Sequence, residues 1–190
     1  MLHKCWILLV GVLLFAACAE PDETGMVTDS DQTEAFFTNI SELCGAWFSG
    51  QATFPDDPEH TLVATGLRVH VTECGDERID LNLYRDGGDT WHATWILEMK
   101  DNGLHLYHDH IGEKEYPEGE EPLTGYGGYA DVRGTSTVQY FPADDHTAEI
   151  LPEAATNVWM MQLDLESGAF VYYLERNDEP RFRAEVYLES

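Results

Sequence analysis

Apolar and polar residues alternate one by one along most of the chain after Cys44, and this period of two constrains the fold most strongly. Successive side chains of a β-strand point to opposite faces of the sheet, so strict alternation predicts half-buried strands rather than helices. The apolar members of the clearest runs are Leu67, Val69 and Val71; Ile79, Leu81 and Leu83; Trp91, Ala93, Trp95 and Leu97; and Phe182, Ala184, Val186 and Leu188.

Short connections rich in glycine, aspartate and asparagine separate these runs, as at 86–89, 101–103 and 177–180. Connections of this kind join neighbouring antiparallel strands as hairpins. The run at 33–43 is the single candidate for a helix longer than a turn or two. We predict strands near residues 45–53, 62–73, 78–85, 90–99, 103–110, 126–132, 135–141, 146–150, 156–165, 169–177 and 181–189.

This pattern predicts an all-β fold, a single antiparallel up-and-down β-barrel of about 8–10 strands. Closing a sheet into a barrel removes the exposed edges that an open sheet of this size would leave. A β-sandwich is the alternative. The folded domain is expected to occupy residues 41–190.

The first 17 residues have the pattern of a secretory signal peptide. Lys4 supplies the positive charge, and residues 6–15 are apolar but too few to span a bilayer, which takes roughly 20. The run Leu14-Phe15-Ala16-Ala17-Cys18 resembles the lipobox of bacterial lipoproteins, with Phe15 where that pattern prefers leucine. The resemblance implies cleavage before Cys18 and its acylation, which anchors the protein in a lipid bilayer. The alternative is an ordinary secretory signal that leaves Cys18 a spare thiol.

The lipobox interpretation predicts an exported protein on the bacterial cell envelope, facing the periplasm or the exterior, and on the outer membrane if the cell has one. Residues 18–40 would then be the lipidated cysteine followed by an acidic flexible tether. The beginning of this segment is rich in Pro, Asp, Glu, Thr and Ser, a composition that does not bury enough apolar surface to order itself.

Two cysteines remain for the folded domain. Cys5 leaves with the signal peptide and Cys18 is acylated, so Cys44 and Cys74 are left in a compartment where disulfides persist. We predict that these two form a disulfide, which contributes roughly 3–4 kcal/mol for a loop of about 30 residues in the chain-entropy model. Neither lies in a CxxC motif, which argues against a metal or redox role.

A family resemblance begins at Gly45-Ala46-Trp47 on the first predicted strand. This Gly-x-Trp resembles the opening of lipocalins and their calycin relatives, and the barrel-length meander agrees with it. The long C-terminal helix of lipocalins is not predicted here, so the chain is more similar to lipocalin-like envelope lipoproteins or to ten-stranded fatty-acid-binding-like barrels. The resemblance implies a cup for one small lipophilic ligand, and it transfers no individual binding residue.

The chain is strongly acidic, with 36 Asp and Glu against 10 Lys and Arg and a net charge of −26. Nucleic acids and anionic membrane surfaces bind through clustered Lys and Arg, so this charge argues against both as direct partners. The carboxylates fall in the tether, in turns and on polar strand faces. We interpret them as a solvating shell rather than as a substrate site.

His108 and His110 are the sharpest candidates for chemistry. Side chains at i and i+2 of a strand share a face, and this face continues from the apolar Leu106, as at the mouth of a cup. Two such imidazoles bind a transition metal or a haem if a third ligand comes from a neighbouring strand, for which His92 and His70 are candidates. Alternatively, these histidines line a polar strand end without a cofactor, and no cofactor is the favoured expectation.

Four tryptophans are candidates for the inner wall of a ligand cavity, with His108 and His110 at its rim: Trp47, Trp91, Trp95 and Trp159. In a barrel, the core and the cavity wall are the same surface. The glycine-rich stretch 125–128 is not followed by the Lys-Ser/Thr pair of a phosphate loop. We interpret it as a tight bend or a bulge.

These features favour a membrane-anchored, non-catalytic module that binds a small lipophilic or amphipathic ligand. The chain has no Gly-x-Ser-x-Gly motif and offers no candidate nucleophile for a hydrolase. Two alternatives stay open: a structural or interaction module of the envelope with a filled barrel, and a histidine-based metal or haem protein. The oligomeric state is not predicted.

Overall fold

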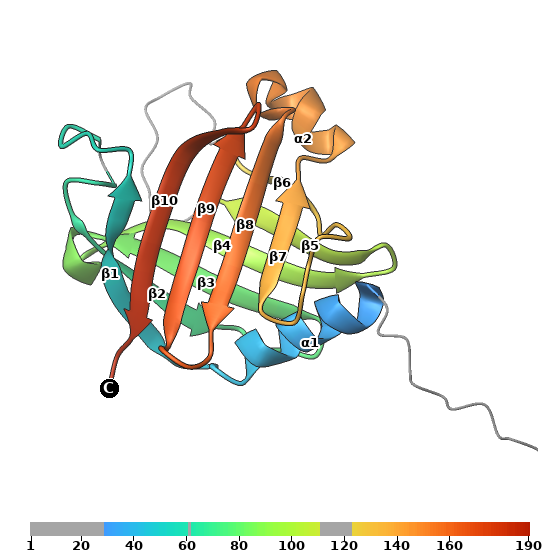
Figure 1. Cartoon of the computed structure of the whole chain (residues 1–190), viewed down its shortest axis with the longest axis horizontal. Coiled ribbons are helices and arrows are strands. Elements are labelled where there is room, and N and C mark those ends of the chain that lie inside the picture. The colour runs from blue at the N-terminus through green and yellow to red at the C-terminus, as the bar shows by residue number, and fades with distance from the viewer. Residues whose placement is uncertain (1–28, 61, 111–122) are drawn as a thin grey trace, which may run out of the picture.

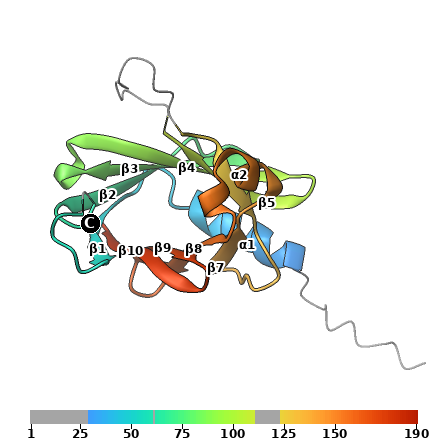
Figure 2. The same cartoon turned by 90° about the horizontal axis from the view of Figure 1, so that it is seen from above.

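Ten antiparallel strands in up-and-down order form one nearly closed, barrel-shaped sheet in the computed structural model, which describes residues 29–60, 62–110 and 123–190 (Figures 1 and 2). The sheet order is β6-β5-β4-β3-β2-β1-β10-β9-β8-β7. The all-β barrel prediction is confirmed, and the sandwich is not observed. The strands are β1 (Trp47–Phe54), β2 (Gly66–Thr72), β3 (Arg78–Arg85), β4 (Thr90–Lys100), β5 (Gly103–Asp109), β6 (Tyr126–Tyr129), β7 (Val138–Pro142), β8 (Asn157–Asp164), β9 (Ala169–Arg176) and β10 (Glu179–Leu188).

A helix, α1 (Asp29–Ser41), closes one end of the barrel (Figure 1). Phe36, Phe37 and Ile40 are buried in the same core cluster as the inward strand residues. Residues 29–40 therefore belong to the folded domain rather than to the predicted tether, and the candidate helix at 33–43 is confirmed as part of α1. The reason is tertiary: this segment buries its apolar side chains against a barrel end that its own composition does not reveal.

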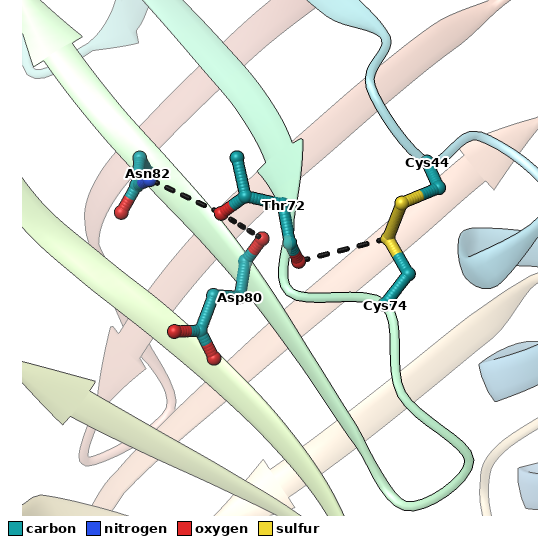
Figure 3. The surroundings of a disulfide bond; sticks show 5 residues. All are labelled: Cys44, Thr72, Cys74, Asp80 and Asn82. Carbon is teal, nitrogen blue, oxygen red and sulfur yellow. Dashed lines mark hydrogen bonds between the residues drawn. A yellow bond between two sulfur atoms is a disulfide. The ribbon is translucent and has the colours of Figure 1, made fainter.

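The predicted disulfide between Cys44 and Cys74 is present, with Cα atoms 6.0 Å apart. Figure 3 shows that it joins the segment between α1 and β1 to the turn that follows β2. Close by, the Val71 N–H donates to the Ala46 carbonyl at 3.0 Å, and the Gly45 N–H donates to the Val71 carbonyl at 2.9 Å. The disulfide thus secures the entry from α1 into the barrel.

The barrel closes where β6 meets β7, the two ends of the sheet order. A Cβ atom at Gly128 would lie 1.8 Å from the Pro142 carbonyl oxygen of β7, and one at Gly127 would lie 1.8 Å from the Leu106 carbonyl oxygen of β5. Only glycine permits so close an approach of backbones. The glycines therefore have a structural role, but it is a close crossing within a strand that pairs regularly with β5, rather than the predicted bend or bulge.

A short helix, α2 (Asp145–Ile150), covers this closure, and the strand predicted at 146–150 is wrong. Asp144 caps the helix by accepting a hydrogen bond of 2.7 Å from the Thr147 backbone N–H, which favours a helical turn over an extended strand. The buried Thr147 hydroxyl accepts from the Gly127 N–H at 2.7 Å and donates to the Gly127 carbonyl at 2.8 Å. The Thr147 hydroxyl thus provides the hydrogen bonds to the Gly127 backbone that a paired strand would otherwise provide on the side of β7.

We expect Gly128→Ala to lower the free energy of unfolding by about 1–3 kcal/mol or more, because β6 and β7 must separate to admit the new methyl group. Gly66→Ala is the matched control, since a Cβ there would meet nothing closer than 3.7 Å. The control should be neutral or slightly stabilising. Urea unfolding followed by circular dichroism measures both effects, and equal stability of the two variants would contradict this account of barrel closure.

Candidate functional site

A cavity of about 240 Å³ lies at the end of the barrel opposite α1, where β5 and β9 end and β4, β6 and β10 begin (Figure 1). Four of the eight histidines of the chain line it: His60, His92, His108 and His110. The strand face that carries His108 therefore does become polar at the mouth of a cup, as its sequence pattern predicted.

The remaining wall is apolar and aromatic, with one guanidinium. The aromatic contributors are Trp95, Tyr126, Tyr172 and Phe182, and the aliphatic ones are Leu62, Leu83, Ala93 and Leu174. Arg181 completes the lining from the start of β10. This combination of an apolar wall and a few polar groups is typical of small-molecule sites.

Side chains fill the interior beyond this cavity. Trp159, Phe141 and Phe170 are almost completely buried between the cavity and α1, and Phe36 reaches the same cluster from α1. The enclosed space is thus confined to one end of the barrel and does not run along its axis.

His108 is buried, and both of its ring nitrogens are hydrogen-bonded. Nδ1 donates to the Tyr126 backbone carbonyl at 3.2 Å, which leaves Nε2 to accept from the Tyr172 hydroxyl at 2.8 Å. Burial lowers the pKa of His108 to about 3, with a further contribution from the neighbouring His110. Burial also raises the pKa of Tyr172 well above its ordinary value, so this phenol keeps the proton that it donates.

His110 lies nearer the mouth and shares Tyr126 with His108. Its Nε2 is 2.8 Å from the Tyr126 hydroxyl, and the Tyr126 ring stacks on both imidazoles, with centroids 4.7 Å from His108 and 5.6 Å from His110. His92 packs edge-on against His110 at 5.9 Å. Burial raises the pKa of Tyr126 to about 12, so its hydroxyl is protonated at physiological pH.

Of the four predicted cavity tryptophans, Trp95 is the one on the cavity wall. Trp95 lines the cavity and stacks on Tyr172, with centroids 4.2 Å apart. Trp159 does not line the cavity but lies beneath it, 5.0 Å from the His108 ring. It supports the cavity without reaching its surface.

Trp47 lies on the outer face, and its predicted cavity position is wrong. Its ring stacks on His70 at 4.0 Å, and the Arg68 guanidinium lies 4.1 Å from the ring centroid. His70 and Arg68 alternate on β2 with the buried Val69 and Val71, which places all three stacked side chains outside the barrel. His70 is therefore also ruled out as a partner of the cavity histidines.

The predicted cavity position of Trp91 is also wrong, and the reason is a β-bulge in β4. Leu83 pairs with Ala93 but Tyr84 pairs with Trp91, so β4 carries His92 as an extra residue between the two pairs. The bulge reverses the alternation, so that His92 lines the cavity while Trp91 donates to the outward Thr94 hydroxyl at 3.3 Å. The unbroken alternation of the sequence gives no sign of this shift.

Several wall residues escaped prediction because they come from distant parts of the chain. His60 and Leu62 belong to the connection between β1 and β2, and Arg181 to the irregular start of β10, where the register shifts between Pro180 and Phe182. Leu83, Ala93 and Phe182, in clear alternating runs, did carry a sequence signal of an inward position. Connections have no periodicity from which an inward direction can be derived.

The arrangement offers little to a metal ion. Within the described residues, no group of three or more His, Cys, Asp or Glu side chains could hold one. His108 and His110 share a face as predicted, but each already contacts a tyrosine, and His70 lies outside the barrel. The geometry therefore gives no support to the metal alternative.

We expect the low pKa of His108 to make the protein acid-sensitive. The pKa of His108 is lower in the folded protein than its unfolded value of about 6.5, so folding favours the neutral ring. The contribution of this difference to the free energy of unfolding is present above pH 6.5. It is lost as the pH falls toward 3, by up to about 1.4 kcal/mol per pH unit. Between pH 6.5 and 5, the free energy of unfolding measured in urea should fall by about 2 kcal/mol more in the wild type than in His108→Gln. His146→Gln, at an exposed position, should match the wild type. An NMR titration in which the His108 ring protonates near pH 6.5 would contradict the prediction.

Comparisons with known proteins assign no family to this chain. No protein-family model matches it, and no curated protein or solved structure matches it either. The lipocalin-like resemblance of Gly45-Ala46-Trp47 stays a prediction.

Proposed function

We propose that this protein is a lipid-anchored lipoprotein of the bacterial cell envelope whose barrel binds one small lipophilic or amphipathic molecule without catalysing a reaction. The observation that carries the proposal is the cavity at one end of an otherwise packed barrel. Apolar and aromatic side chains supply most of its wall, and histidines with one arginine supply the polar groups.

The size of the cavity limits the ligand. At about 240 Å³ it falls below the roughly 300–1,000 Å³ of sites for drug-sized ligands. It has room for about eight waters, at ~30 Å³ each in the liquid. The ligand is therefore a molecule of roughly that many non-hydrogen atoms, or one end of a longer molecule.

The packed interior supports the second candidate, a structural or interaction module with a filled barrel. Trp159, Phe141 and Met161 leave no continuous channel beneath the cavity. The composition of the cavity wall favours binding instead. Trp95 and Tyr172 line it together with four histidines, and a barrel end with a purely structural role does not require such a recess.

The membrane anchor is supported by the sequence alone. Cys18 and the lipobox-like run lie outside the described residues, and α1 begins at Asp29. Among the helices that the structure describes, none is long and apolar enough to cross a membrane. Acylation of Cys18 is the means of attachment that we propose.

We expect small apolar and amphipathic molecules that do not fluoresce, such as cyclohexane, cyclohexanol and hexan-1-ol, to change the tryptophan fluorescence of the purified protein. Trp95→Phe should lose this response because Trp95 lines the cavity. Trp47→Phe is the matched control and should keep it, since Trp47 lies on the outer face. If no member of the panel shifts or quenches the fluorescence at millimolar concentration, the protein is the structural module instead.

We expect Cys18→Ser to abolish attachment to membranes. The wild type, expressed with its own signal in a bacterium that processes lipoproteins, should incorporate labelled palmitate and partition into the detergent phase of a Triton X-114 extraction. Cys44→Ala/Cys74→Ala is the control, because it removes two cysteines that form the disulfide and should still be labelled. Labelling of Cys18→Ser, or none in the wild type, would contradict the anchor.

A further inference from the structure

The cavity differs in charge from the rest of the molecule. The chain holds 36 Asp and Glu and a net charge of −26, yet among the described residues no carboxylate lines the cavity. Four histidines and Arg181 line it instead. Within the described part of the chain, this wall brings no anionic group against a bound negative charge, although the protein as a whole is strongly acidic.

His108 takes no part in ligand recognition, because its two nitrogens are already bonded to Tyr126 and Tyr172. His60 is different. Its Nδ1 accepts the Leu62 backbone N–H at 3.3 Å, so the neutral ring carries its proton on Nε2 and is a donor there. His60 also stacks on Phe182 at 5.9 Å, which places a donor beside the apolar wall.

Arg181 supplies the positive charge of the cavity. Its nearest ion pair is with Glu179 at 3.9 Å, and the two side chains are 47% and 75% exposed. Ion pairs this long and this exposed contribute little to stability, so the Arg181 guanidinium can bind a ligand in place of Glu179. Guanidinium groups bind carboxylates through two parallel hydrogen bonds.

The overall negative charge does not prevent this recognition. At physiological ionic strength the Debye length is about 8 Å, so exposed carboxylates farther away are largely screened. The groups within the cavity then dominate the field that a ligand meets. The overall charge slows the approach of an anion without changing the preference inside the cavity.

We propose that the cavity selects small organic anions: a carboxylate held near Arg181 and His60, with an apolar or aromatic group against Trp95 and Phe182. This inference rests on the proposed binding function and specifies its ligand class. The small volume excludes long-chain fatty acids from complete enclosure. It fits an aromatic or short branched acid.

Benzoate, benzamide and benzamidinium test the charge preference, since they have nearly the same shape and are anionic, neutral and cationic. Titrations followed by Trp95 fluorescence in about 0.15 M chloride should show benzoate binding at least about tenfold more tightly than benzamide, and benzamidinium binding most weakly. Arg181→Gln should reduce the benzoate preference to within about twofold and leave benzamide binding unchanged.

Arg133→Gln is the matched control. Arg133 is 46% exposed, close to the value for Arg181, but pairs with Asp131 outside the cavity, so its loss should leave all three affinities unchanged. Benzamide or benzamidinium binding as tightly as benzoate would overturn the inference while the proposed binding function stands. A benzoate preference that survives in Arg181→Gln would overturn it as well. If none of the three binds, the inference fails. The fluorescence test with small uncharged molecules, described under the proposed function, then decides whether the binding function fails with it.

Discussion

The close approach of β6 to its two neighbours is the contact on which the rest of the structure depends. Gly127 and Gly128 bring the β6 backbone against β5 on one side and β7 on the other, closer than any Cβ would allow. Without this approach the ten-stranded sheet would stay open between β6 and β7 and expose two edges. Thr147 and Asp144 of the α2 region then satisfy the backbone groups that the two strands do not pair.

Closure also assembles the cavity. It brings His108 of β5 against Trp159 of β8 and Tyr172 of β9, strands that lie on the opposite arm of the sheet order. The Tyr172 hydroxyl and the Tyr126 carbonyl then hold the buried imidazole in its neutral form. His108 therefore links the two halves of the barrel and forms part of the cavity wall, and its chemistry is that of a fixed hydrogen-bonding group.

Prediction from the sequence succeeded where a local rule applies and failed where a distant contact decides. The sequence pattern located all ten strands to within four residues at either end and put Trp95 and His108 on the inner face, because side-chain direction in a strand is a local property. It failed at Trp91, where a single extra residue, His92, reverses the alternation. It failed at residues 146–150, where the Asp144 cap favours a helical turn. At residues 29–40 the sequence offered a candidate helix from residue 33 but not its place in the core, because these apolar side chains need the barrel end to be buried.

The all-β class, the antiparallel order and the Cys44–Cys74 disulfide can be derived from the residues alone, because each follows from periodicity, short connections or the number of cysteines available. Which side chains meet at the open end of the barrel depends instead on how the whole chain folds. His60, His108 and Tyr172 come from separate parts of the chain and share no pattern, and the folded barrel brings them together. A barrel interior is shared by all its strands, so its free volume and its charge are not properties of any one segment.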